Sequence, residues 1–446
     1  MKLTLLVTIL CISLSSHAQS LEWEILETHD PIAEFHPTAL AVAPSGTFYV
    51  TGKYQHGTEY YKSVDGVTVI ADSTMPNIGL FGSMFVYKFT SDGKLANRSF
   101  AGGLASEYRK LKPEDFRKDH LMLPSVVEGN TIQVTSTGKL FITGFANGYR
   151  EKNYETDRAQ GIFAMMLDTN FMLKWDKMYP SFYNSTPQKA IENEDGQFII
   201  LGTSLIKTVD VSKYLSENTV SPRILKVSAK GKLLADTLLQ DLPSREDLYW
   251  DDTDKHTYLA GEATSFVEMP TGYLFSGTIK ERSIGSSVSR YAALLMETDK
   301  DFKPLRKKTY TLFREQYSQY EFIGGNIAVS KKAIALTGVA QIGHPPCFTA
   351  LIDRETFDTI AVVRMDGDVF SYPGIAKVGT GKYAVALKDH HEKAMQLHFI
   401  ENNTITKTIT LKKYPIIDYV DMQRQGDYLY ILGYADKGCY IAKVRL

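Results

Sequence analysis

Residues 137–144 read Thr-Gly-Lys-Leu-Phe-Ile-Thr-Gly, a tight turn followed by a short apolar run and a closing glycine. This phrase decides the fold because it recurs along the chain, and a recurring short unit is the signature of a repeat architecture. Six further copies lie at 45–52, 195–202, 271–277, 331–338, 380–387 and 426–433. The copy at 380–387 ends in Leu387 and lacks the closing glycine.

Each copy belongs to a longer unit that contains four short strands. A strand precedes the phrase, as at 131–135, and two more follow it, as at 162–168 and 173–179, with Gly, Asp and Asn in the turns. A helical solenoid is disfavoured, because runs of strand length recur where periodic helices would be needed. Four antiparallel strands per repeat are typical of a propeller blade. The sequence therefore predicts an all-β, seven-bladed β-propeller of four-stranded blades.

The two ends of the chain predict how the ring closes. The seventh unit stops at Leu446 after its third strand, and residues 21–27 (Leu-Glu-Trp-Glu-Ile-Leu-Glu) match the fourth-strand phrase at 173–179. We expect the N-terminal strand to complete the last blade, which would remove two exposed sheet edges.

This pattern resembles the repeats of the secreted bacterial β-propeller proteins of the SBBP or Delta-60 type. Their repeats combine a Gly-Gly-aromatic-hydrophobic-x-Gly phrase with a hydrophobic-Lys-Leu-Asp phrase that leads to a Gly and a Trp. The matching segments here are 195–202 with 224–231, and 138–144 with 162–175. The resemblance covers nearly the whole chain after the N-terminal segment. It implies the propeller fold and export, and it implies no common activity.

Composition and charge exclude several classes of protein. The 446 residues are 43% hydrophobic, and 50 Lys and Arg balance 51 Asp and Glu to a formal charge of −1. Without a basic excess to neutralise phosphates, nucleic acid is not expected as a partner. Scattered glycine and proline and recurrent apolar runs argue against collagen-like, coiled-coil and disordered chains.

Residues 1–18 predict a signal peptide. Lys2 precedes the apolar run 3–14, and Ser16 and Ala18 are the small residues that signal peptidase needs. A lipoprotein signal centred on Cys11 fits less well, because Leu10 is bulky. No later stretch reaches the roughly 18 apolar residues of a membrane span. We expect residues 19–446 to form a single propeller domain, exported as a monomer to the periplasm, the cell surface or the medium.

Removal of the signal peptide would leave Cys347 and Cys439. Both lie in strand-like apolar runs, which predicts two buried thiols. A disulfide between them stays open at this point, although two cysteines do not make a disulfide framework.

The topology of a four-stranded meander predicts where a ligand would bind. Turns between the first and second strands and between the third and fourth lie on one face, and here they are tight. The other face carries the loops between the second and third strands and the connections between blades. It receives the long segments 53–83, 101–130, 145–160, 203–221, 241–261 and 278–290. Long loops on a rigid scaffold are where binding groups usually lie, although they could simply cover the ring.

These long loops are rich in aromatic and polar residues. Aromatic faces beside carboxylates and amides suit sugars, and they suit peptides equally well. We expect the ligand face in 53–83, 145–160 and 241–261, with Trp250 as anchor, although Trp250 could instead fill the space between two blades. The candidate ligand-binding residues are Tyr54, His56, Tyr149, Tyr249, Trp250, Asp251, Asp252 and His256.

Searches for catalytic motifs find little. A phosphate-binding loop, His-Glu-x-x-His, Gly-x-Ser-x-Gly and the Asp box of sialidases are all absent from the sequence. Asp251, Asp252, Asp254 and His256 could bind Ca²⁺ or act as an acid–base pair, but the segment lacks the EF-hand spacing and a solvated loop is the simpler interpretation. We therefore predict no catalytic residue, no metal and no cofactor.

The leading hypothesis is a secreted, non-enzymatic binding module that recognises a glycan or a peptide on its long-loop face. One alternative is a propeller glycosidase or polysaccharide lyase, in which carboxylates from different blades would meet at the central mouth. Another is a structural component of the cell envelope. Carboxylates paired over the mouth would favour an enzyme, and a groove lined by aromatic side chains would favour binding.

Overall fold

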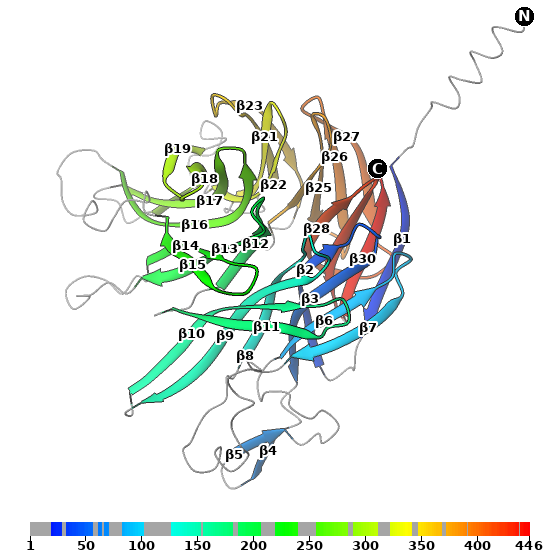
Figure 1. The fold of residues 1–446 in the computed structure, drawn as a ribbon. Helices are drawn as coiled ribbons and strands as arrows, with labels where there is room; N and C mark the ends of the chain where they lie inside the picture. Colours follow the sequence, from blue (N-terminus) through cyan, green and yellow to red (C-terminus); the bar gives the residue numbers. More distant parts are fainter. Residues whose placement is uncertain are drawn as a thin grey trace, which may run out of the picture.

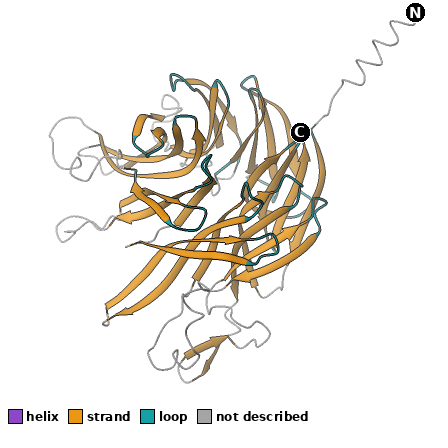
Figure 2. Ribbon diagram, in the orientation of Figure 1, coloured by secondary structure: helices purple, strands orange, loops and turns teal. Residues whose placement is uncertain are grey.

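The repeat phrase forms the second strand of every blade. The computed structural model describes residues 19–28, 33–56, 61–64, 67–70, 83–101, 126–152, 155–181, 186–206, 219–239, 256–283, 289–310, 322–340, 347–367, 372–389, 391–436 and 438–446. Seven four-stranded antiparallel sheets form a ring (Figure 1). The described residues contain strands and loops but no helix (Figure 2), and hence no helix that could cross a membrane. The predicted seven-bladed β-propeller is confirmed.

The blades are numbered in chain order, and the strands of each are given from the axis of the ring outward. Blade 1 contains β2 (Ala33–Val42), β3 (Phe48–His56), β6 (Ser83–Phe89) and β7 (Leu95–Ala101). Blade 2 contains β8 (Val126–Val134), β9 (Leu140–Lys152), β10 (Glu155–Leu167) and β11 (Leu173–Ser181). Blade 3 contains β12 (Thr186–Glu192), β13 (Phe198–Ile206), β14 (Thr219–Val227) and β15 (Leu233–Leu238).

Blade 4 contains β16 (His256–Met269), β17 (Gly272–Ser283), β18 (Ser289–Asp299) and β19 (Pro304–Tyr310). Blade 5 contains β20 (Phe322–Val329), β21 (Ala333–Ala340), β22 (Cys347–Asp353) and β23 (Thr359–Met365). Blade 6 contains β24 (Gly374–Gly379), β25 (Lys382–Lys388), β26 (Met395–Glu401) and β27 (Thr404–Leu411). Blade 7 contains β28 (Ile416–Gln425), β29 (Tyr428–Ala435), β30 (Gly438–Arg445) and β1 (Ser20–Thr28), and β4 (Tyr61–Val64) and β5 (Val67–Ile70) form a separate ribbon.

The N-terminal strand completes the last blade. β1 pairs antiparallel with β30 from Ser20 opposite Arg445 to Thr28 opposite Gly438. The innermost strands β28 and β2 are also in contact, as are those of every other pair of neighbouring blades. The ring is therefore closed both at the axis and at the seam between the two ends of the chain, as the sequence predicts.

The core lies between the blades. Each sheet buries apolar side chains on both faces, and each face packs against a neighbouring blade. Phe141 of blade 2, for example, stacks on Phe198 of blade 3 with ring centroids 3.9 Å apart. Cys347 and Cys439 are buried and do not form a disulfide, so the prediction of two buried thiols is confirmed.

Outer-strand tryptophans and turn phenylalanines fill equivalent positions between blades. Trp23 lies over Gly93 in the β6–β7 turn of blade 1, and Trp175 lies over Gly231 in the β14–β15 turn of blade 3. In blades 2, 4 and 5, where the preceding outer strand has no tryptophan, the turn carries a phenylalanine instead of glycine. These phenylalanines have positive φ, which bulky side chains rarely adopt, and they are Phe171 (66°), Phe302 (65°) and Phe357 (61°).

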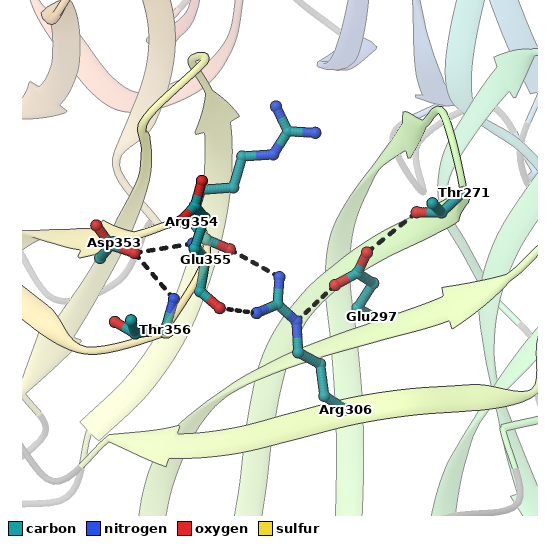
Figure 3. Close-up of polar contacts among 7 residues, drawn as sticks. All are labelled: Thr271, Glu297, Arg306, Asp353, Arg354, Glu355 and Thr356. Atoms are coloured by element: carbon teal, nitrogen blue, oxygen red, sulfur yellow. Dashed lines mark hydrogen bonds and ion pairs between the residues drawn. The ribbon is translucent and has the colours of Figure 1, made fainter.

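Burial explains why this conformation is tolerated. Phe302 is 4% exposed and stacks on Tyr273, and Phe357 is 3% exposed beneath the guanidinium of Arg306, which lies 3.7 Å from its ring centroid. Figure 3 shows Arg306 bridging blades 4 and 5. It donates to Glu297 in its own blade (2.6 Å) and to the carbonyl of Arg354 in the next (2.7 Å).

The repeat glycines are required because no side chain fits there. In six blades the glycine pairs with the innermost-strand residue that precedes a β-bulge, as Gly129 and Gly144 do in blade 2. A Cβ added to Gly144 would overlap the carbonyl oxygen of Glu128 and the ring of Phe163. None of the six glycines has positive φ, so the requirement is steric. In blade 6 the phrase ends in Leu387. The innermost strand β24 begins only after the position that would lie opposite Leu387.

A buried histidine between blades 5 and 6 predicts a pH dependence of stability. His398 is 6% exposed, its Nδ1 bonds Thr408 Oγ1 (2.8 Å), and its Nε2 has no partner among the described residues. Burial lowers the pKa of His398 below its usual 6.5, against the opposing charges of Asp366 and Asp389. The unfolded chain therefore binds the proton more readily than the folded chain does. Stability should be complete above about pH 6.5 and fall as the pH is lowered.

The measurement is the thermal midpoint of the protein and of His398→Gln between pH 7.5 and 5.0. The wild-type midpoint should fall more steeply than that of the variant, because glutamine does not titrate. Parallel curves would show that His398 does not contribute to the acid sensitivity.

Candidate functional site

The long-loop face is partly built from strands. Residues 145–152 and 155–160, within a segment for which the sequence predicts a loop, instead extend β9 and β10, and Figure 1 shows this hairpin projecting beyond the ring. Most of 278–290 likewise belongs to β17 and β18. The reason is that a hairpin continues as long as both strands can pair, and the polar residues there do not prevent pairing. The segments that point away from the tight turns are therefore more rigid than loops would be.

Six residues lie where innermost strands begin or second strands end, at the long-loop end of the axis. We call them the mouth cluster. They come from blades 1, 2, 6 and 7, and they are His36, Lys53, Glu128, Tyr372, Asp418 and Tyr434.

Two direct contacts in the mouth cluster join neighbouring blades. Lys53 of blade 1 forms an ion pair with Glu128 of blade 2 at 2.5 Å, and their side chains keep 28% and 24% exposure. The ring of His36 in blade 1 packs on that of Tyr434 in blade 7, with centroids 4.8 Å apart. Tyr372, just before β24, is 36% exposed. The cluster thus presents aromatic faces and both signs of charge to solvent.

Sequence patterns in the loops do not reveal the mouth cluster, because its residues lie in strands or, for Tyr372, just before one. Lys53 and Tyr434 each follow a repeat glycine directly, Gly52 and Gly433. That position ends the second strand on the long-loop face, so alignment of the seven phrases could have identified it. Glu128 and His36 precede the bulges, which the sequence does not reveal.

The residues predicted from the sequence lie in several places. Tyr54 and His56 belong to β3, opposite Phe35 and Ala33, and Tyr54 directly follows Lys53 of the mouth cluster. Tyr149 lies in the β9–β10 hairpin opposite Arg158, and His256 begins β16 opposite Ser283. The predictions that fall outside the described residues are Tyr249, Trp250, Asp251 and Asp252.

Below the mouth cluster, side chains bond each innermost strand to the next blade. The bulge residues Thr38 and Thr264 donate to the carbonyls of Gly129 (2.5 Å) and Gly325 (2.9 Å). These bonds satisfy backbone groups on strand edges that no further strand covers. The other five junctions are Glu192 N to Gln133, Lys189 to Ser265, Asn326 to Pro373 O, Arg424 to Lys377 O, and Leu40 N to Asp421.

Lys189 and Asp421 place opposite charges near the axis. Burial lowers the pKa of the Lys189 amino group, and the negative charge of Asp421 opposes this shift. Burial raises the pKa of Asp421, against the N–H groups of Leu40 and Met422 and the charge of Lys189. The Lys189 amino group donates to Ser265 Oγ at 2.9 Å, but Ser265 is 0% exposed. A substrate therefore cannot reach that hydroxyl, and the bond between Lys189 and Ser265 joins blades 3 and 4.

No protein-family model matches this chain, and no curated protein matches it. The resemblance to the SBBP or Delta-60 repeats therefore stays a prediction, whereas the propeller fold that it implies is observed. Groups of three or more potential metal ligands are also absent from the described residues.

Solved structures match the fold. A polysaccharide lyase, described as an ulvan lyase bound to -[GlcA(1-4)Rha3S]-, aligns with a TM-score of 0.50 and 9% identity over 95% of this chain and 93% of its own. A protein of unknown function from Dyadobacter fermentans aligns with a TM-score of 0.44 and 10% identity, over 97% of this chain and 100% of its own. The Dos1 propeller aligns with a TM-score of 0.45 and 11% identity, over 96% and 95%. At these identities the likeness concerns the fold alone.

Proposed function

We propose that this protein is an exported, non-enzymatic binding module that recognises a glycan or a peptide on the long-loop face of its propeller. The observation that carries the proposal is the mouth cluster, in which the Lys53–Glu128 ion pair and the His36–Tyr434 ring contact join blades 1, 2 and 7 at the end of the axis where Tyr372 of blade 6 also lies. Aromatic rings provide contact area at a low entropy cost, and charged groups beside them orient the hydroxyls or amides of a ligand.

The contacts at the mouth favour binding over hydrolysis. A glycosidase needs one carboxyl group as acid and a second, separated from it by about 5–9.5 Å, as nucleophile or base. Glu128 is instead held by Lys53 at 2.5 Å, and near the axis the two carboxylate oxygens of Asp421 accept from the N–H groups of Leu40 (2.9 Å) and Met422 (2.7 Å). The matching polysaccharide lyase shares only the fold. We propose export because of the signal-like segment 1–18.

Binding to a panel of oligosaccharides and peptides tests this function, with Lys53→Met as the variant. Methionine keeps the length of the side chain and removes its charge. We expect Lys53→Met to weaken binding about tenfold, which corresponds to about 1.4 kcal/mol. Lys230→Met, on an exposed tight turn of the opposite face, is the matched control and should bind normally.

Three results would contradict the proposal. Turnover of a polysaccharide would show an enzyme, and absence of any binding would favour a structural role in the envelope. If Lys230→Met lost as much affinity as Lys53→Met, the ligand would not bind specifically on the long-loop face.

A further inference from the structure

Tyr372 is an exposed aromatic residue that lies next to the backbone of the adjacent blade. It precedes β24 of blade 6 and is 36% exposed. A methyl group added to Gly325, in the innermost strand of blade 5, would come within 3.3 Å of the Cβ and Cδ1 atoms of Tyr372. Gly325 therefore leaves the space in which the tyrosine sits.

Hydrogen bonds on both sides fix this arrangement. The carbonyl of Pro373, the next residue, accepts from Thr337 Oγ1 (2.8 Å) and Asn326 Nδ2 (3.2 Å) of blade 5. The carbonyl of Gly325 accepts from Ser276 (2.7 Å) and Thr264 (2.9 Å) of blade 4. The backbone next to Tyr372 is thus held across two blade junctions, so it loses little freedom when a ligand binds.

Asn326 adds a polar group beside the ring. It follows Gly325, it is partly exposed, and its Nδ2 is oriented by the bond to Pro373. None of the described residues donates to its Oδ1. An aromatic face and an oriented amide are complementary to a sugar ring, whose C–H face stacks while its hydroxyls donate to the amide oxygen.

The same contacts disfavour a peptide at this position. An extended peptide commonly adds as a strand to a free sheet edge, where it needs unpaired carbonyls. On β20 the carbonyl of Gly325 already accepts from Ser276 (2.7 Å) and Thr264 (2.9 Å).

We propose that Tyr372 and Asn326 form a saccharide subsite, in which the sugar ring stacks on Tyr372 and a hydroxyl donates to Asn326 Oδ1. This inference rests on the proposed binding function and deepens it, because it names the ligand class and a second side of the mouth.

Calorimetric titration tests the subsite with defined probes. These are tetrasaccharides of glucose, of N-acetylglucosamine and of alternating uronic acid and neutral sugar, together with a set of extended peptides. At least one tetrasaccharide should bind the wild-type protein. Tyr372→Ala should weaken that binding at least tenfold, whereas Tyr372→Phe, which keeps the ring, should stay within threefold. Tyr428→Ala removes a partly exposed tyrosine from the tight-turn end of β29 and should bind normally.

The outcomes separate this inference from the proposed function. If Lys53→Met weakens saccharide binding but Tyr372→Ala does not, the mouth binds the ligand and the subsite is wrong. If only peptides bind, the ligand class is wrong. If no probe binds, both proposals fail. If Tyr372→Ala fails to fold, Asn326→Ala provides the second test, because it removes the Oδ1 acceptor while Thr337 Oγ1 still bonds the Pro373 carbonyl (2.8 Å). Asn326→Ala should weaken binding of the same tetrasaccharide, and unchanged binding would contradict the subsite.

Discussion

A chain that begins at residue 29 should be largely unfolded or aggregated at temperatures where a chain that begins at residue 19 is stable. The deletion removes β1 and leaves β30 as an open edge. It also removes Trp23, whose ring stacks on that of Phe48 in blade 1 with centroids 5.9 Å apart. Ile25 is lost as well, and it packs against the same group of buried apolar side chains as Trp23. Burial of each such side chain contributes about 1.5–3 kcal/mol, and the total stability of a domain is only about 5–15 kcal/mol.

Thermal denaturation and sedimentation of the two chains measure this effect. Trp23→Ala keeps β1 but removes the packing of this one side chain, and it should lower the free energy of unfolding by about 3 kcal/mol. Glu22→Ala is the matched control in the same strand. It removes only the partly exposed ion pair with Arg445 (2.8 Å) and should change stability by less than about 1 kcal/mol. Equal midpoints for the two chains would mean that β1 does not close the ring.

Gly144→Val should be the most destabilising single substitution among the repeat glycines. The added side chain would overlap the Glu128 carbonyl and the ring of Phe163, neither of which can move without breaking the pairing of β8 with β9 or disturbing the buried core. We expect a loss of more than about 4 kcal/mol, which is the range of severe core disruption.

Gly379→Ala provides the comparison. It lies at the end of β24, and its added methyl group would meet only the side chain of Lys382 at 3.5 Å, an ordinary contact. It should change the unfolding free energy by less than about 1 kcal/mol in urea denaturation. A similar small effect for Gly144→Val would show that the bulge relaxes and that the glycine is not required.

The fold could be predicted because it is specified locally and repeatedly. Each phrase such as 137–144 contains its own turn and strand signals, and the missing fourth strand after Leu446 identified β1 as its replacement. The bulges could not be predicted, because a bulge depends on the pairing of two strands and leaves no mark in one of them. The bulges place the hydroxyl groups of Thr38 and Thr264 where they donate hydrogen bonds to the next blade.

The candidate site was harder to predict for a related reason. Lys53 and Glu128 meet because two blades are neighbours in space, although 75 residues separate them in the chain. The prediction of aromatic ligand-binding residues on the long-loop face stays a prediction, although Tyr54 directly follows Lys53 in β3. Composition could not distinguish loop from strand at 145–160, since polar residues are compatible with both.

Hydrogen–deuterium exchange in the presence of the tightest-binding oligosaccharide or peptide tests the central claim most directly, namely that the ligand binds at the long-loop end of the axis. Slower exchange should appear in peptides that cover 35–38, 52–54, 126–130, 372–375 and 433–435. The tight turns at 90–94, 168–172 and 228–232 should exchange as they do without ligand. Protection confined to those turns, with unchanged exchange around the mouth cluster, would contradict the account.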